Sequence, residues 1–578
     1  MASRRTRAGG KGRVGSSGVM SEPTPSNNAP AGLGEIEGAR VERALAKRSA
    51  EDLPRLSRLW AYYRNPELGA GDSGIAWAKT LETRDDHAAV WPWRGGRRRT
   101  AQELGLPARL RGASVGAAHG YTPGGALGAG LGDDRDDQRE VVIENDIGWR
   151  LDTMIDFLFG NPIRLVSLRA DGRDDGDGND QGEGAERRAL IERVLESVWE
   201  ASGGPALLQD MALLGHVYGF VDLVLRWDEG LALAAGAAGL TDAEEIAEAA
   251  GAALRIEVVE PTRSAPVVSA SDYRRIEAYA IATEREEEAH GGVHAEARGG
   301  VWRMLGVSPR SNGGSGGAEV RTSEVVEVLR AGGRRVYVDG ALAHESSGVI
   351  AQALGRAPVV HVQNLTQPFR YAGVSEVEQL APLQDELNTR LSDRASRVTL
   401  QSFKMYLAKG LDGFAEGRVG PGQVWSTDNP DASIESFGGD AQSPSESAHI
   451  DEVREAMDKV SGVPPLAGGV VRARIGNLSS ATALRITLMG LLAKTARKRV
   501  TYGGGIAAMS RMVLGALDAA GVLKTTPAER AVRVAWPDPV PADVRERIAA
   551  AMAKRDLGVS DERVLAELGE SAADPGIG

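Results

Sequence analysis

Residues 459–517 read KVSGVPPLAGGVVRARIGNLSSATALRITLMGLLAKTARKRVTYGGGIAAMSRMVLGAL. The stretch contains no Asp or Glu, although the 80 acidic residues of the 578-residue chain would place about eight in it by chance. Its cations are Lys459, Arg472, Arg474, Arg485, Lys494, Arg497, Lys498, Arg499 and Arg511. Positive charge is thus concentrated on one loop and one long helix, which suits local contact with a phosphate backbone. Neutralisation of acidic neighbours across a subunit interface is the alternative.

Glycine and apolar spacing divide this stretch into two elements. Residues 463–478 contain Gly468, Gly469 and Gly476 and predict a flexible loop that carries Arg472 and Arg474. Residues 479–524 predict a long helix, in which the structural glycines Gly503, Gly504 and Gly505 mark a kink.

Helices are also predicted just before the loop. Leucines recurring every three or four residues predict one helix over residues 373–401. A second helix is predicted over 443–462, where Ser443 is the N-cap, Pro444 the first helical residue and Glu446 the acid of a capping box. Residues 402–442 between them are rich in Gly, Pro and Asp. They predict a small excursion with short strands such as 423–425.

The first half of the chain predicts helices followed by sheet. Residues 53–63 and 147–159 have helical spacing, and residues 254–362 contain short β-prone runs with turns at Gly332-Gly333 and Asp339-Gly340. Residues 1–45 form a basic arm expected to be disordered, 112–137 a Gly/Ala-rich loop and 171–186 an acidic loop. After the long helix, two short helices are expected at 542–555 and 561–568.

Composition excludes several classes of protein. With 68 Lys plus Arg against 80 Asp plus Glu, the net charge is −12, so the chain does not coat nucleic acid over its whole surface. The absence of cysteine excludes disulfides, thiolate metal sites and cysteine nucleophiles. At 42% hydrophobic residues the chain can fill several domains, yet no run is apolar enough to suggest a membrane-spanning helix.

Four motif-like patterns lack the context that chemistry needs. Residues 112–116 match a nucleophile elbow but follow no strand, and 490–495 lack the glycine of a phosphate-binding loop. Residues 175–186 have calcium-loop spacing with Asp180 where the turn needs glycine, and His290 and His294 have no third ligand. We therefore expect no catalytic residue, no metal and no cofactor.

The order of these elements, with local sequence, resembles the tailed-bacteriophage portal protein family. The similar segments lie between about residues 55 and 569, and their specificity is in their order, since each is weak alone. They are WAYYRN at 60–65, APVVHVQN at 357–364, GVSEVE at 373–378, LQDELN at 383–388, LSD at 391–393, SGVP at 461–464 and SSATAL at 479–484.

The resemblance implies an α+β, elongated multidomain fold assembled as a cyclic ring. The implied parts follow the predicted elements in order. They are a wing at 46–372, stem helices at 373–401 and 443–462, a clip at 402–442, a tunnel loop at 463–478, a long kinked wing helix at 479–524 and a C-terminal wing or short helical crown at 525–578.

The resemblance also implies a function that is not enzymatic. Such a ring, typically of 12 subunits, sits at one capsid vertex of the virion and passes double-stranded DNA during packaging and ejection. Its implied partners are the major capsid protein, the terminase and a head-tail adaptor, with no membrane, and it assembles in the host cytoplasm. In that setting Arg472 and Arg474 face DNA, while Arg485, Lys494, Arg497, Lys498 and Arg499 contact DNA or a neighbouring subunit. The alternative is a DNA-binding assembly factor or minor capsid protein that forms no ring.

Overall fold

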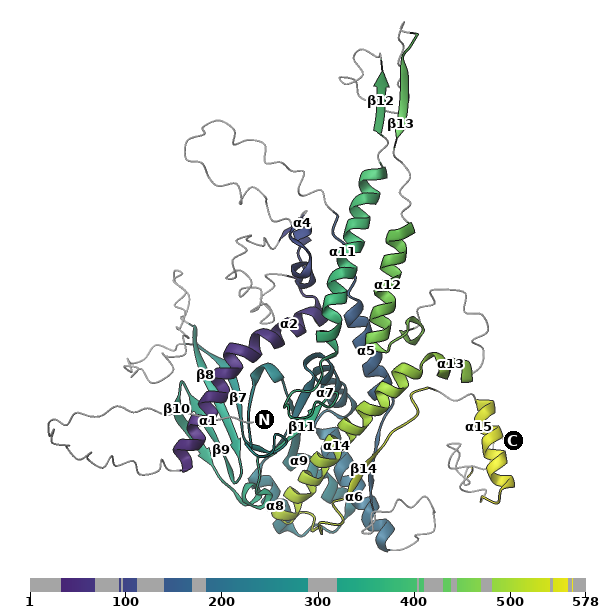
Figure 1. Ribbon diagram of the computed structural model, residues 1–578. Coiled ribbons are helices and arrows are strands. Elements are labelled where there is room, and N and C mark those ends of the chain that lie inside the picture. The colour runs from purple at the N-terminus through teal and green to yellow at the C-terminus, as the bar shows by residue number, and fades with distance from the viewer. Residues whose placement is uncertain are drawn as a thin grey trace, which may run out of the picture.

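The computed structural model describes residues 33–67, 93–94, 97–111, 140–168, 183–288, 320–402, 405–409, 430–437, 444–468, 481–540, 544–559 and 564. Within these residues, helices combine with antiparallel sheets in a mixed fold. Figure 1 shows a broad body from which two long helices project side by side, with a short hairpin at their tip.

Helices make up most of the described body and the whole projection. The α-helices are α1 (Leu33–Lys47), α2 (Leu53–Arg64), α4 (Ala108–Arg111), α5 (Asp146–Phe159), α6 (Glu183–Ala201), α7 (Gly204–Tyr218), α8 (Glu229–Ala238), α9 (Ala243–Ala253), α10 (Val349–Leu354), α11 (Glu376–Ser402), α12 (Pro444–Ser461), α13 (Ala481–Thr487), α14 (Met489–Ala520) and α15 (Val544–Asp556). Shorter turns are the π-helical η1 (Arg48–Asp52) and the 3-10 turns η3 (Ala101–Gly105), η6 (Pro261–Arg263) and η8 (Pro465–Gly468).

All described strand pairs are antiparallel. The larger sheets have the orders β10-β9-β8-β7-β6 and β11-β4-β5, and the pairs β1-β2, β12-β13 and β14-β3 stand apart. The strands are β1 (Trp93–Arg94), β2 (Arg97–Arg98), β3 (Arg164–Ser167), β4 (Phe220–Trp227), β5 (Leu254–Val259), β6 (Ser264–Val268), β7 (Ile276–Glu288), β8 (Val320–Arg330), β9 (Gly333–Val338), β10 (Ala341–Ser346), β11 (Val359–Gln363), β12 (Met405–Lys409), β13 (Ser433–Phe437) and β14 (Val532–Ala535).

The predicted amphipathic faces of the two projecting helices are confirmed near the body. Leu380 and Leu387 of α11 and Ile450 and Met457 of α12 are buried in one core with α2, α5 and α7. Toward the tip this packing ends, and Val398 of α11 is 40% exposed. Among the described residues, apolar surface is therefore partly exposed on the distal part of the projection.

Helix α14 runs through the largest core and is continuous at the position of the predicted kink. The helix is uninterrupted through Gly503, Gly504 and Gly505, while the break with α13 falls at Leu488. Gly505 lies against β11, where an added Cβ would come 2.2 Å from a methyl group of Val362. The glycine thus permits close helix–strand packing at this position.

Three other predictions need correction. The expected disordered arm contains α1, because Val41 and Leu45 bury their side chains against the five-stranded sheet. The expected acidic loop at 171–186 is corrected at its end, since Glu183 and the residues after it belong to α6. The first predicted turn is shifted by one residue, as Gly332 has a positive φ of 79° while Gly333 begins β9.

Each remaining sequence prediction is either confirmed or falls on residues outside the described part of the chain. The helices at 53–63 and 147–159 and the turn Asp339-Gly340 are confirmed, both turn residues having positive φ. The helix at 542–555 corresponds to α15. Residues 112–137, the strand piece at 423–425 and nearly all of the helix at 561–568 lie outside the described residues.

Candidate functional site at the α12–α13 connection

The two arginines predicted to face DNA, Arg472 and Arg474, lie in residues 469–480, outside the described part of the chain. The structure describes both flanks of this connection. On one side α12 ends at Ser461 and η8 follows, and on the other side α13 begins at Ala481 and leads into α14. The contacts of these flanks determine where the connection leaves the fold and where it returns.

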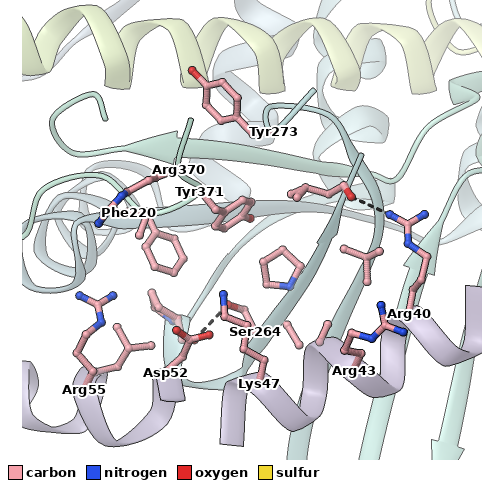
Figure 2. Close-up of a pocket in the computed structure, with 18 of the residues that line it drawn as sticks. Arg40, Arg43, Lys47, Asp52, Arg55, Phe220, Ser264, Tyr273, Arg370 and Tyr371 are labelled. Atoms are coloured by element: carbon pink, nitrogen blue, oxygen red, sulfur yellow. Dashed lines mark hydrogen bonds between the residues drawn. The ribbon is translucent and has the colours of Figure 1, made fainter. Parts of the chain in front are cut away.

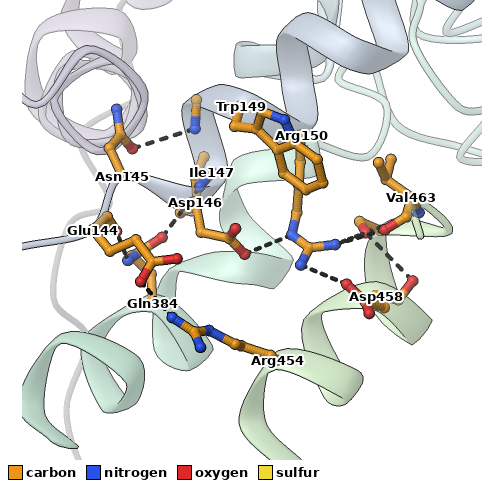
Figure 3. Close-up of polar contacts among 12 residues, drawn as sticks. Glu144, Asn145, Asp146, Ile147, Trp149, Arg150, Gln384, Arg454, Asp458 and Val463 are labelled. Atoms are coloured by element: carbon orange, nitrogen blue, oxygen red, sulfur yellow. Dashed lines mark hydrogen bonds and ion pairs between the residues drawn. The ribbon is translucent and has the colours of Figure 1, made fainter. Parts of the chain in front are cut away.

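The first flank is held by Arg150, a fully buried residue of α5 (Figure 3). Its Nε donates to Asp146 Oδ2 at 2.7 Å, and its Nη2 donates to Asp458 Oδ1 of α12 at 2.6 Å. Its Nη1 donates to Ser461 Oγ at 3.0 Å and to the backbone oxygen of Val463 at 2.8 Å. Because an uncompensated buried charge is costly, this full set of acceptors fixes the guanidinium. Arg150 therefore joins α5 to the end of α12 and to the residue two positions beyond it.

Two glycines on the same flank occupy positions where a residue with a side chain would be strained or would clash with a neighbour. Gly462 has a positive φ of 73°, the conformation common just after a helix C-terminus. A Cβ on Gly468 would lie 2.4 Å from the indole of Trp149. Val463 between them is fully buried in a small apolar cluster with Leu491 of α14. The chain is thus held firmly up to residue 468.

On the second side, a buried ionic cluster at the start of α11 holds α14, the helix that follows α13. Glu376 Oε2 accepts from Lys494 Nζ at 2.5 Å, and Glu376 Oε1 lies 2.8 Å from Lys498 Nζ. Lys494 Nζ also donates to the backbone oxygen of Ser461 at 2.8 Å. These three charged side chains have exposed fractions of 8% or less. The cluster therefore ties α14 to the first turn of α11 and to the end of α12.

Burial and charge set the protonation of this cluster. Burial alone would raise the pKa of Glu376, but the charges of Lys498 and Lys494 outweigh it and lower this pKa to about 2. Burial lowers the pKa of Lys498 to about 8, although Glu376 opposes this shift. Burial and the charge of Lys498 lower the pKa of His216, on α7, well below its usual value. At pH 7 Glu376 is therefore ionised and the His216 imidazole is neutral.

Two of the five helix cations predicted to contact DNA or another subunit are in the protein interior. Lys494 and Lys498 are 6% and 2% exposed, and both ammonium groups face Glu376. The prediction is wrong for these two lysines, because neither reaches a surface of the protomer. The sequence shows their charge but not their burial.

The other three predicted helix cations are at least partly accessible. Arg485 pairs with Asp538 at 2.6 Å in an exposed contact. The guanidinium of Arg499 stands 5.2 Å from the centre of the Trp536 ring. Arg497 is exposed on α14. For these three residues, contact with DNA or a neighbouring subunit stays a prediction.

The predicted capping box is described only in part. Ser443 lies outside the described residues, while Glu446 in the first turn of α12 forms an ion pair with Arg397 of α11. This contact joins the two projecting helices. The capping role of both residues stays a prediction.

Three residues of this site were not predicted from the sequence, namely Arg150, Glu376 and His216. Asp146 and Arg150 are four residues apart on a predicted helix, a spacing that suggests an ion pair. Glu376 lies in the first turn of a helix, where the sequence predicts no more than a favourable interaction of the acid with the helix dipole. The long-range partners that make these residues important are 118 to 313 positions away.

The motif-like patterns give no site among the described residues. Residues 490–495 lie in the first turns of α14, which begins at Met489, rather than in a helix interior. No group of three or more His, Asp or Glu in the described part of the chain is placed to hold a metal ion. Residues 112–116, most of 175–186, His290 and His294 are outside that part. Across the described helices, none combines the length and apolar character needed to cross a membrane.

Comparison with known proteins gives a family match. Residues 152–570 match the family described as "Phage portal protein, SPP1 Gp6-like". No curated protein matches the chain. Similar solved structures include a chain of the "Virion of native gene transfer agent (GTA) particle", at 14% identity and a TM-score of 0.36, covering 73% of this chain and 89% of that one. A chain of the "Neck of empty GTA particle computed with C6 symmetry" matches at 15% identity and a TM-score of 0.38, covering 73% and 90%.

Proposed function

Because the chain belongs to the phage portal protein family, we propose that residues 469–480 line the DNA channel of a ring and that Arg472 and Arg474 contact the phosphate backbone there. As a portal protein the chain is a ring subunit at a capsid vertex. The observation that carries the proposal is the pair of buried anchors, centred on Arg150 and Glu376, that hold the end of α12 and the first half of α14 on either side of this connection.

The anchors give the connection defined ends. Arg150 fixes the chain at Val463, and Lys494 fixes the start of α14 against Ser461. A connection between two fixed ends can follow a moving duplex without displacing the helices that carry it. Arg472 and Arg474 contact DNA transiently and without reading sequence, since phosphate contacts carry no base information.

Charge supports the same assignment. No acid lies between Lys459 and Leu517 to pair with either arginine locally. Ring symmetry repeats the two arginines into a positive belt, whereas the chain as a whole carries a net charge of −12. A mostly negative wall with one positive belt limits the tight, salt-sensitive adhesion that would stall DNA.

The other parts of the fold take their roles from the same family assignment. Helices α11 and α12 form the stem, the β12–β13 hairpin at their tip belongs to the clip, and the body with α14 forms the wing (Figure 1). Exposed apolar surface toward the tip, such as Val398, is covered by neighbouring copies in a closed ring, typically of twelve subunits.

The proposed partners follow from these parts. The clip docks the terminase during packaging and a head-tail adaptor afterwards, and the wing contacts the major capsid protein. The ring assembles in the host cytoplasm and stays at the unique capsid vertex of the virion. It acts as a structural channel without catalytic residues.

Replacing both loop arginines tests the proposal. In R472A/R474A we expect rings and capsids to assemble while DNA packaging or retention falls, because the belt is lost but the anchors remain. The control R164A/R255A removes two exposed arginines of β3 and β5 and should package normally. Failure of the R472A/R474A rings to assemble would instead assign these arginines to subunit contacts. Normal packaging and retention would remove them from DNA handling.

A further inference from the structure

A groove on the body lies apart from the channel loop and its anchors. It encloses about 650 Å³ between the helices α1 and α2, the edge strand β6 and the segment that follows β11. Figure 2 shows Arg43, Lys47 and Arg55 on the helical wall and Arg370 with Tyr371 on the opposite wall. None of its lining residues belongs to the Arg150 or Glu376 contacts.

The lining of the groove is basic in an acidic protein. Its charged residues are five cations and one acid, namely Arg40, Arg43, Lys47, Arg55, Arg370 and Asp52. Arg40 pairs with Glu277, and Arg55 lies 3.4 Å from Glu378. Arg43, Lys47 and Arg370 are exposed, and within the described residues no ion pair is recorded for any of them. Three cations on facing walls therefore have free donors.

Aromatic side chains form the rest of the site. Phe220 and Tyr371 line its wall, and Tyr273 and Phe369 stand with ring centres 6.0 Å apart. Phe369 is 87% exposed and has a positive φ of 64°, a strained conformation for a residue with a side chain. The structure thus holds a large apolar side chain at the groove without covering it.

The aromatic wall is rigid. Tyr371 OH donates to the fully buried Asp222 at 2.8 Å, and its ring stacks on His361 at 3.8 Å between centres. His361 lies between two acceptors, with Nδ1 2.7 Å from Asp222 Oδ1 and Nε2 2.7 Å from the backbone oxygen of Tyr371. These contacts fix the segment that carries Arg370 and Phe369 before any ligand arrives.

Two other modes of binding fit the groove poorly. Addition of a strand along β6 is hindered because Pro266 offers no N–H and Arg40 Nη2 already donates to the oxygen of Val268 at 2.8 Å. A DNA duplex, whose major groove alone is about 12 Å wide, is a bulky occupant for a groove that encloses only about 650 Å³. A slender ligand with several negative charges and an apolar side chain fits both the shape and the charge.

We propose that this groove binds an acidic peptide segment of a partner protein. Carboxylates of the segment pair with Arg43 and Lys47 on one wall and Arg370 on the other. An apolar side chain of the segment packs on Phe369 and Tyr273, which removes the exposed ring from water. The partner thereby attaches to the body of the subunit, away from the channel loop.

Fluorescence anisotropy of the assembled wild-type protein with a labelled peptide, Gly-Asp-Glu-Phe-Glu-Asp-Gly, tests the site. We expect saturable binding that weakens as salt rises, and no binding of the analogue in which Asn and Gln replace the acids. The variant R43E/R370E should weaken binding about tenfold or more, since it reverses charge on both walls. The control R164E/R255E makes the same charge change elsewhere on the surface and should bind as wild type.

A second variant tests the apolar contact, because Phe369→Ser removes the ring without changing charge. It should weaken the acidic peptide several-fold while circular dichroism stays unchanged. Equal binding of the neutral analogue, unaltered binding to R43E/R370E, or displacement of the peptide by an equimolar DNA duplex would each overturn the proposal. Disassembly of R43E/R370E rings would do so as well, because it would make a second copy of this chain the occupant.

Discussion

Lys498 Nζ lies 2.8 Å from Glu376 Oε1 and joins α14 to the first residue of α11 within the protein interior. Lys494 Nζ pairs with the same carboxylate and donates to the backbone oxygen of Ser461, the last residue of α12. The cluster therefore connects α11, α12 and α14. The flank of the proposed channel loop therefore depends on Glu376.

Glu376→Gln should lower the free energy of unfolding by about 3–5 kcal/mol, because two ammonium groups lose their buried counter-charge. Urea unfolding of the protein measures this loss. Glu378→Gln, an exposed substitution two residues along the same helix, is the matched control and should cost less than about 1 kcal/mol. Equal effects of the two substitutions would show that the buried cluster adds no stability.

The lowered pKa of Glu376 predicts an acid-sensitive step. The unfolded carboxyl binds its proton near pH 4.5 and the folded one near pH 2, so the unfolded state binds more protons between these values. The stability from this group is therefore complete above pH 4.5 and is lost as pH falls toward 2, a change on the order of 3 kcal/mol. Unfolding curves at several pH values should show a weaker acid dependence in Glu376→Gln. The same pH dependence in both proteins would contradict this assignment.

Asp385 should have the opposite pH dependence. Burial raises the pKa of Asp385 to about 6, although Tyr62 OH donates to its carboxylate at 2.9 Å. The folded state then binds more protons between pH 3.8 and 6, so the contribution of Asp385 falls as pH rises through this window. Asp385→Asn, which keeps an acceptor for Tyr62, should gain about 3 kcal/mol at pH 7 and little at pH 3.5. A loss of stability at pH 7 would show that the ionised form is favoured.

Much of this arrangement could be predicted from the sequence, because periodic apolar positions determine helices locally. The spacing of Leu380 and Leu387 predicted α11, and that of Ile450 and Met457 predicted α12. The burial of Lys494 and Lys498 was not predictable in the same way, since it depends on Glu376, more than 100 positions away. Helix α1 was missed because, among its described residues, the short set Val41, Ala44 and Leu45 carries the apolar face that packs on the sheet.

Arg150→Met should loosen the chain just after α12, because Asp146, Asp458 and the carbonyl of Val463 lose their shared donor. A cost of about 3–5 kcal/mol is expected in unfolding experiments. Hydrogen exchange should also show faster exchange at the amide of Val463, which now donates to Ser461 Oγ at 3.1 Å. Arg164→Met, an exposed arginine of β3, should change neither quantity. Unchanged protection of Val463 would mean that Arg150 does not anchor this flank.

The position of the channel loop relative to DNA can be measured directly, because the chain contains no cysteine. A single cysteine at position 473, between the two loop arginines, can carry a photoreactive group in particles stalled during packaging. We expect a DNA adduct from position 473 and none from a matched cysteine at the exposed Leu342 of β10. Assembled, DNA-containing particles that give no adduct at 473, or equal adducts at both positions, would contradict the assignment of residues 469–480 to the channel wall.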